Sequence, residues 1–153
     1  MSLILGKEYC KLDSNGRFKL PIALKKQLES SDNRFVIKNS IFSECLELWT
    51  YASFEKEIEK LKSKLNPYSI EDRHLLRKFS EGNIIEMDSN DRFVIPAEQK
   101  DVLKSGKELV LQSVGDWIEI WDYDTYQKET SAATTDYAQQ ANQRLGQLSA
   151  EQQ

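Results

Sequence analysis

Two decapeptides of the chain each place an acid and a guanidinium four residues apart. Residues 12–21 read LDSNGRFKLP and residues 87–96 read MDSNDRFVIP, so Asp, Ser, Asn, Arg, Phe and Pro recur 75 positions apart. Such a pair is suited to binding rather than catalysis, because a guanidinium is a planar fork of hydrogen-bond donors that fits guanine O6 and N7 or a phosphate. An aspartate four residues earlier can hold that fork in one rotamer or cap the turn. The pairs are Asp13 with Arg17 and Asp88 with Arg92.

The segment between each Asp and Arg has the composition of a tight turn. Asp and Asn side chains bond to their own backbone, and Gly16 takes a left-handed conformation without steric cost. Asp91 stands at the same place in the second copy and takes that conformation with some strain. Alternating runs on both sides predict a hairpin in each copy. Pro21 and Pro96 then close the strand and suit the start of a short helix.

The rest of each copy predicts a helix followed by two strands. Helices are expected over 22–28 and 97–103, and strands over 35–38, 46–49, 109–112 and 118–121. A unit this small rarely buries enough apolar surface to stand alone. We therefore expect an α+β fold in which two halves with interleaved strands form one β-rich domain with a pseudo-two-fold axis. Trp49 and Trp121 are expected in its core or at an interface. Phe18 and Phe93 could stack on bases, but their position in the strand after the turn favours the core.

The copies are separated by a helical segment and followed by a polar one. A stripe of apolar residues predicts a helix over 53–65 with Ser53 as its N-cap, and a second helix is expected over 69–80. After residue 126 large apolar groups are scarce, which predicts a frayed helix or a disordered tail. The expected organisation is a first module (6–51), linking helices (52–81), a second module (82–126) and a tail (127–153).

Composition narrows the class of protein. The chain of 153 residues is 39% hydrophobic and 30% charged, no apolar run reaches the roughly 18 residues that span a bilayer, and the N-terminus lacks a basic signal-peptide region. We expect a cytoplasmic protein without a membrane partner, cofactor or metal. Cys10 and Cys45 are interpreted as small buried apolar groups and His74 as a surface residue. The sequence therefore offers few candidates for a catalytic nucleophile, base or metal ligand, and we do not expect an enzyme.

The net charge of −4 is unevenly distributed. Residues 1–65 hold 12 Lys and Arg against 9 Asp and Glu, a net of +3, whereas residues 66–153 hold 9 against 16, a net of −7. The mean charge therefore does not exclude a nucleic-acid partner.

The segments GKEYCKLDSNGRFKLP, MDSNDRFVIP and VGDWIEIWDYDTY together resemble the MraZ family of bacterial transcriptional regulators, which carry two AbrB-like swapped-hairpin modules per chain. The resemblance covers about residues 6–126. It implies a nucleoid-associated repressor of the division and cell-wall gene cluster. It also implies binding of double-stranded promoter DNA at short G-rich direct repeats, and assembly into a homo-oligomeric ring. The Asp-x-x-x-Arg positions of the family map onto Asp13 and Arg17, and onto Asp88 and Arg92.

The candidate DNA-contacting residues centre on the two arginines at the turns. The complete set is Arg17, Arg92, Asp13, Asp88, Asn15, Gly16, Asn90, Lys7, Lys11 and Lys19. The lysines would meet phosphates, which supply most of the non-specific affinity. The second copy has Asp91 in place of glycine and Val94 in place of Lys19, so the first copy is expected to bind DNA more strongly. Asn15 departs from the lysine that the family often has there.

Other interpretations stay open from the sequence. The Asp–Arg pairs could be salt bridges that only shape their turns. The chain could also be an AbrB-like antitoxin, because it ends in a polar tail, or a ring-forming scaffold that does not bind DNA.

Overall fold

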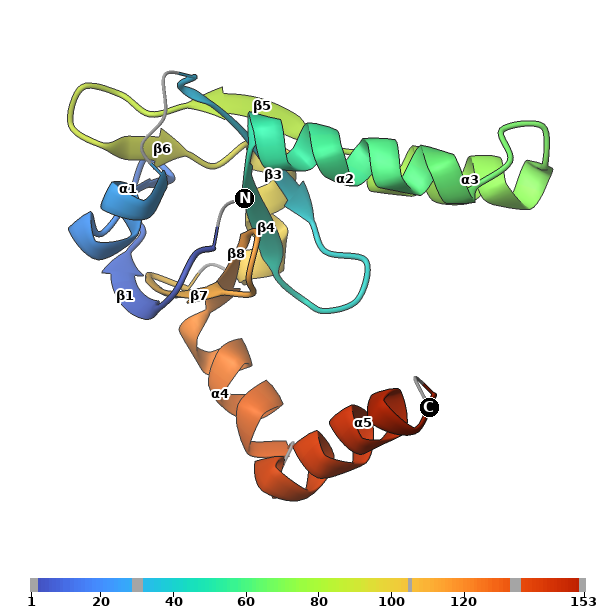
Figure 1. The fold of residues 1–153 in the computed structure, drawn as a ribbon. Coiled ribbons are helices and arrows are strands. Elements are labelled where there is room, and N and C mark those ends of the chain that lie inside the picture. Colours follow the sequence, from blue (N-terminus) through green and yellow to red (C-terminus); the bar gives the residue numbers. More distant parts are fainter. Residues whose placement is uncertain (1–2, 29–31, 105, 133–135, 152–153) are drawn as a thin grey trace.

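The computed structural model describes residues 3–28, 32–104, 106–132 and 136–151. The chain is a mixed α+β protein, as predicted, and each recorded strand pair is antiparallel (Figure 1). The strands are β1 (Lys7–Lys11), β2 (Arg17–Lys19), β3 (Arg34–Asn39), β4 (Leu46–Thr50), β5 (Asn83–Glu86), β6 (Arg92–Val94), β7 (Glu108–Ser113) and β8 (Ile118–Asp122). The helices are α1 (Ile22–Leu28), α2 (Tyr51–Lys64), α3 (Ile70–Phe79), the 3₁₀ helix η1 (Ala97–Leu103), α4 (Tyr123–Ala132) and α5 (Tyr137–Glu151).

The larger sheet has the pseudo-two-fold symmetry that the repeat predicts. Its strand order is β1-β7-β8-β4-β3-β5, so equivalent strands of the two copies lie at equal distances from the centre. The axis passes between β4 and β8, where Glu47 lies opposite Glu119. The outer strands are exchanged: β1 of the first copy pairs with β7 of the second, and β5 of the second pairs with β3 of the first.

The smaller sheet joins the copies at the same axis. Its two strands, β2 and β6, place Phe18 directly opposite Phe93, with ring centroids 5.6 Å apart. Both phenylalanines are buried, at 1% and 0% exposure, which confirms their predicted place in the core. Leu20 and Ile95, which are also equivalent positions, lie in the same hydrophobic cluster. Neither copy could bury these side chains without the other.

The strands on either side of each turn do not form the hairpin ladder that the sequence predicts. In the first copy one isolated bridge, Leu12 to Phe18, joins the two sides of the turn. Beyond it β1 pairs with β7 and β2 pairs with β6. The reason lies in the core, because only pairing between the copies brings Phe18 against Phe93.

Two helical predictions are also corrected. The helix over 97–103 is a 3₁₀ helix rather than an α-helix. In it, Gln99 occupies the position of Leu24 in the first copy, and its Nε2 donates to the Ile37 carbonyl at 3.1 Å. The N-cap of α2 is Thr50, not Ser53: the Thr50 hydroxyl accepts from the Ser53 N–H at 3.2 Å. The helix starts earlier because strand β4 runs directly into it. Ser69 caps α3 in the same way.

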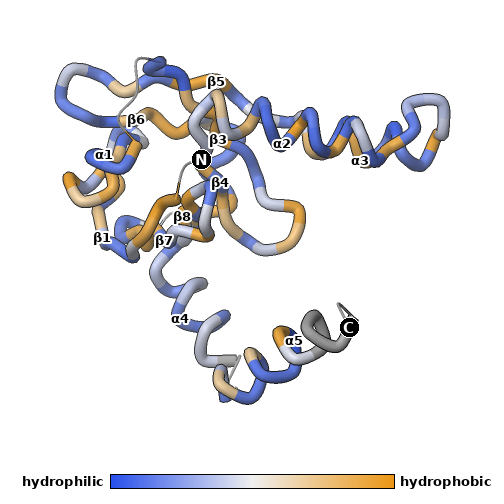
Figure 2. The backbone as a smooth tube through the Cα atoms, in the orientation of Figure 1, coloured by the Kyte–Doolittle hydropathy of each residue, from blue (hydrophilic) through white to orange (hydrophobic). Residues whose placement is uncertain are grey.

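Two helical arms extend from the sheets in Figure 1, α2 with α3 on one side and α4 with α5 on another. The apolar stripe of α2 is half-buried and shows in Figure 2 as alternation of hydrophobic and hydrophilic segments. Lys38, itself only 3% exposed, donates to the Phe79 carbonyl at 2.8 Å and so ties the end of α3 to β3. In the polar segment after residue 126, residues 127–132 form the rest of α4 and residues 137–151 form α5, while residues 133–135 and 152–153 lie outside the described residues. Among the described helices none is long and apolar enough to cross a membrane.

Candidate nucleic-acid interface

The first turn, residues 13–16, is organised by one carboxylate. Asp13 Oδ1 accepts from the backbone N–H groups of Asn15 and Arg17, at 2.9 and 2.8 Å. Its other oxygen, Oδ2, accepts from the Arg17 Nε–H at 3.2 Å. The backbone closes the turn with a bond from the Asp13 N–H to the Arg17 carbonyl at 2.8 Å. One side chain thus shapes the turn and orients the guanidinium, as the four-residue spacing predicts.

The second turn, residues 88–91, repeats the backbone bonds of the first. Asp88 Oδ1 accepts from the N–H groups of Asn90 and Arg92, at 2.8 and 3.0 Å. The ion pair is looser here, with 3.6 Å between Arg92 Nε and Asp88 Oδ2. Asp91 has a φ of 62°, so it does adopt the left-handed conformation expected of it. This turn forms the loop between β5 and β6 that projects at the upper left of Figure 1.

Reciprocal backbone bonds hold the two turns together. The Leu20 N–H donates to the Asp91 carbonyl at 2.9 Å, and the Ile95 N–H donates to the Gly16 carbonyl at 2.8 Å. Each bond runs from the strand of one copy to the turn of the other. The two turns therefore belong to one rigid ribbon, β2–β6, rather than to separate loops.

Electrostatics follows from this packing. The pKa of the Asp13 carboxyl is lowered chiefly by the hydrogen bond from the Arg17 backbone N–H, with a smaller effect of the guanidinium. The backbone N–H of Arg92 likewise lowers the pKa of Asp88, and the charges of Arg92 and Arg17 add to that effect. Because Arg17 belongs to the other copy, the two Asp–Arg pairs share one electrostatic environment.

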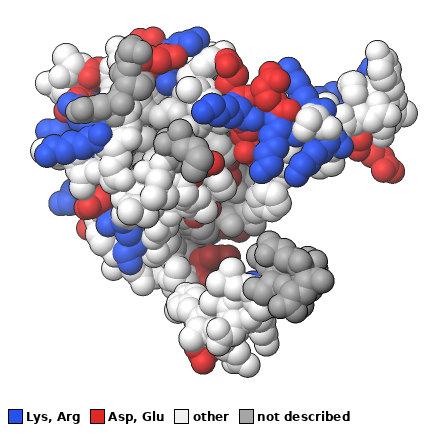
Figure 3. Space-filling view, viewed as in Figure 1, with Lys and Arg blue, Asp and Glu red and all other residues white. Residues whose placement is uncertain are grey.

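The predicted lysines fall into two groups. Lys19 lies opposite Arg92 in the β2–β6 register, and Lys11 ends β1 close to the first turn. Lys7 lies at the far end of β1, with its ammonium 5.8 Å from the Tyr9 ring centroid and 5.7 Å from that of Tyr126. The structure therefore brings Lys11 and Lys19 to the turns but not Lys7. Figure 3 shows Lys and Arg gathered over α1 and, mixed with acidic groups, along α2.

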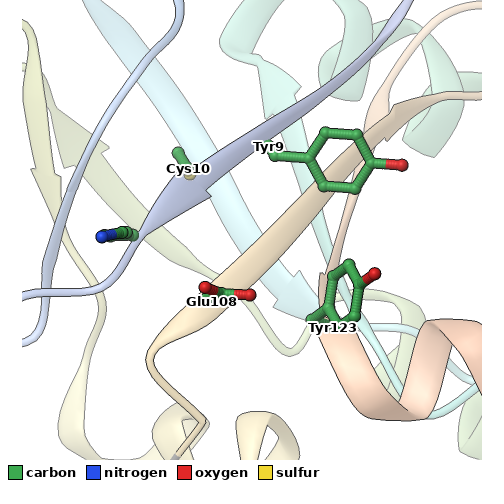
Figure 4. Close-up of a pocket in the computed structure, with 5 residues that line it drawn as sticks. Tyr9, Cys10, Glu108 and Tyr123 are labelled. Atoms are coloured by element: carbon green, nitrogen blue, oxygen red, sulfur yellow. The ribbon is translucent and has the colours of Figure 1, made fainter.

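A shallow pocket of about 410 Å³ lies beside β1 and the start of α4 (Figure 4). Tyr9, Cys10, Glu108 and Tyr123 line it together with Lys11. Burial raises the pKa of the Cys10 thiol to about 12, which disfavours the reactive thiolate form at neutral pH. Within the described residues no cluster of His, Cys, Asp and Glu could hold a metal ion.

Two residues at the turns escaped sequence reasoning, Lys25 and Lys100. Lys25 on α1 forms an ion pair with Asp91 at 3.0 Å, and Lys100 on η1 lies over Gly16. Each lysine comes from the copy opposite to the turn it meets. The two lysines are 75 positions apart, as are the two decapeptides, and this spacing could have identified them as equivalent residues. It does not show which turn each lysine reaches.

Exchanged outer strands and paired turns define a duplicated swapped-strand module, and comparison with known proteins agrees. The family model described as "MraZ protein, putative antitoxin-like" matches residues 3–78 and 79–148. The chain is 37% identical over 148 residues to the transcriptional regulator MraZ of Flavobacterium psychrophilum, covering 95% of this chain and 94% of that protein. The MraZ regulator of Christiangramia forsetii is 33% identical over 145 residues, covering 94% of this chain and 93% of that protein.

A more distant relative extends the comparison. The transcriptional regulator MraZ of Mycoplasmoides gallisepticum is 29% identical over 130 residues, covering 85% of this chain and 89% of that protein. The chain belongs to the MraZ family. That family is one of transcriptional regulators, which is not a class of enzyme.

Proposed function

We propose that this protein is a transcriptional regulator that binds double-stranded DNA through its two paired turns. The observation that carries the proposal is the repeated Asp–Arg geometry on one rigid ribbon. A binding group that is fixed before contact loses less entropy on binding. Family membership supports the same class of function.

Arginine is the group proposed to contact bases. Asp13 engages Arg17 through Nε, and no other described residue forms an ion pair with that guanidinium. Its two terminal nitrogens remain available as a fork, which matches guanine O6 and N7 in the major groove. Arg92 occupies the equivalent place in the second turn. Asn15 and Asn90 are exposed beside the arginines and are proposed to contact DNA as well.

Phosphate contacts are proposed for the lysines near the turns. Lys19 and Lys11 are exposed, and Lys19 lies opposite Arg92. Such contacts position a protein on the duplex and carry most of its non-specific affinity. Lys7 is the weakest candidate of the set, because it lies at the other end of β1.

We further propose repression of the promoter of the division and cell-wall gene cluster, in the cytoplasm at the nucleoid. The family resemblance supports short direct repeats as the target and a ring of several copies as the binding form. One ribbon is a small contact for specific binding. Several ribbons on successive repeats would gain by effective concentration, so that a chain of net charge −4 still binds DNA.

The test compares wild type with Arg17→Ala/Arg92→Ala on DNA from upstream of its own gene and on shuffled DNA. Fluorescence anisotropy at two salt concentrations gives affinity, specificity and salt slope, and size-exclusion chromatography checks assembly. We expect a loss of about 1–3 kcal/mol per engaged turn with assembly unchanged. Equal binding by both proteins, or no binding by wild type, would contradict the proposal.

An antitoxin is the second candidate. The family description contains the words "antitoxin-like", and α5 exposes the described side chains of residues 137–146, which a protein partner could cover. An antitoxin of this type would keep DNA binding but lose partner binding when residues 136–153 are removed. A scaffold that does not read DNA would show no specific binding in the anisotropy experiment.

A further inference from the structure

The fourth position of each turn meets a lysine from the opposite copy. In the second turn that position is Asp91, and Lys25 of α1 reaches it with 3.0 Å between Nζ and Oδ1. Both side chains are about one-third exposed, at 33% for Lys25 and 30% for Asp91. The second turn therefore contains a lysine whose charge is already paired.

The first turn has the same lysine but not the acid. Lys100 stands 75 positions after Lys25, and Gly16 stands 75 positions before Asp91. Lys100 lies so close over Gly16 that a Cβ added there would overlap its Cε and Nζ. Among the described residues no ion pair or hydrogen bond is recorded for the Lys100 ammonium.

The difference at one position changes the charge of the two turns. With the reaching lysine counted, the first turn has Asp13 against Arg17 and Lys100, a net of +1. The second turn has two acids, Asp88 and Asp91, against Arg92 and Lys25, a net of zero. An ammonium beside a turn tip is a suitable point charge for a phosphate, whereas one held by a carboxylate is not.

Resting on the proposed function, we propose that Lys100, supplied by the second copy, is a DNA-phosphate contact of the first turn. Asp91 prevents Lys25 from taking the same role in the second turn. The residue at the fourth turn position thus sets how strongly each turn binds the DNA backbone. This gives a physical cause for the expected inequality of the two copies.

The first experiment measures salt slopes of DNA binding for Lys100→Gln, with Lys25→Gln as its matched control. One lost phosphate contact lowers the slope by about one per engaged turn, which is roughly a threefold smaller change in affinity between 50 and 200 mM salt. We expect that loss for Lys100→Gln and little change for Lys25→Gln. A merely structural lysine at position 100 would change thermal stability without changing the slope.

The second experiment exchanges the deciding residue. Asp91→Gly is expected to raise affinity and slope, and adding Lys25→Gln in that background should remove the gain. Gly16→Asp is expected to lower both and to make Lys100→Gln silent, because the new carboxylate pairs with Lys100. Asp91 shows that an aspartate can occupy this position with a φ of 62°, close to the 75° of Gly16, at the cost of some backbone strain. In Gly16→Asp the end of the flexible Lys100 side chain must also shift, because the new Cβ would overlap its Cε and Nζ. Thermal unfolding and oligomer size check each variant.

The outcomes separate this inference from the proposed function. If Arg17→Ala weakens binding but Lys100→Gln and Lys25→Gln behave alike, the lysine inference is wrong and the function stands. An unchanged slope in Asp91→Gly overturns it as well. If wild type does not bind DNA, both fail together.

Discussion

At the scale of single residues, Asp13 and Asp88 are the side chains that shape the two turns of the candidate interface. Each carboxylate accepts two backbone N–H groups. Asp13 also accepts from the Arg17 Nε–H, whereas Asp88 forms only a 3.6 Å ion pair with Arg92, whose buried Nε–H has no hydrogen-bond partner among the described residues. The Arg17–Asp13 pair is about one-third exposed, so solvent screens its ion pair and the pair alone contributes little to stability. The value of the pair lies in fixing the guanidinium. The sequence predicted this pair because both residues are local, but it did not predict which copy supplies Lys25 and Lys100.

The two turns should lose their carboxylate hydrogen bonds only when the pH falls below the usual pKa of an aspartate side chain. The pKa values of Asp13 and Asp88 are lowered from 3.8 in the folded protein, chiefly by backbone N–H donors. Their contribution to stability is therefore complete above pH 3.8 and is lost as the pH falls through the lower folded values. Carboxyl ¹³C shifts followed by NMR should give midpoints below 3.8 for both residues.

The Asp13→Asn variant is the control for this titration. It keeps a side-chain acceptor but cannot ionise, so the acid-dependent shift of the Arg17 amide should disappear. A midpoint at or above 3.8 for Asp13 would contradict the proposed role of its carboxylate.

At the scale of elements, the sequence predicted strands better than their partners. The β-rich runs over 35–38, 46–49, 109–112 and 118–121 located β3, β4, β7 and β8, because strand propensity is largely a local property. Pairing is not local: β1 leaves its neighbour β2 for β7, which depends on the burial of Phe18 against Phe93. The start of α2 was missed for a similar reason, since Thr50 serves both as a strand end and as a cap.

Lys38 is expected to hold the α2–α3 arm to the sheet. Its ammonium donates to the Phe79 carbonyl at 2.8 Å, and burial lowers its pKa. Lys38→Met leaves that carbonyl without its donor and leaves buried Glu47 without the cation across the β3–β4 ladder. The expected loss of unfolding free energy is about 1–3 kcal/mol.

Urea unfolding measures that loss, and hydrogen exchange should show faster opening of α3. The matched control is Lys60→Met on the exposed side of α2, which should change stability by less than about 0.5 kcal/mol. Equal stability of Lys38→Met and Lys60→Met would show that the buried bond does not secure the arm.

At the scale of the whole molecule, the two copies form one folding unit because they exchange strands in both sheets. The repeat in the sequence predicted this duplication and its axis. Helix α5 stands apart from the unit, since the side chains of residues 136–146 are exposed. Because these side chains are exposed, α5 gains little stability from packing against the body of the chain. A helix of 15 residues without such packing is only marginally stable in water.

Removal of residues 136–153 should therefore leave the body intact. We expect a change in unfolding free energy within about 0.5 kcal/mol, because exposed surface contributes little to stability. Urea unfolding gives the free energy, and native mass spectrometry of the same samples reports the number of copies. A loss of 2 kcal/mol or more would mean that α5 packs against the body in solution.

The most direct test of DNA reading by the turns is the ratio of affinities for upstream and shuffled DNA in Arg17→Lys/Arg92→Lys. Lysine keeps the charge but not the planar fork. If the arginines read bases, the difference in binding free energy between upstream and shuffled DNA should shrink by about 1–3 kcal/mol per engaged turn. The affinity for shuffled DNA and the salt slope should stay the same. An unchanged ratio would contradict base readout by the arginines, and the Asp–Arg pairs would then be elements of the fold alone.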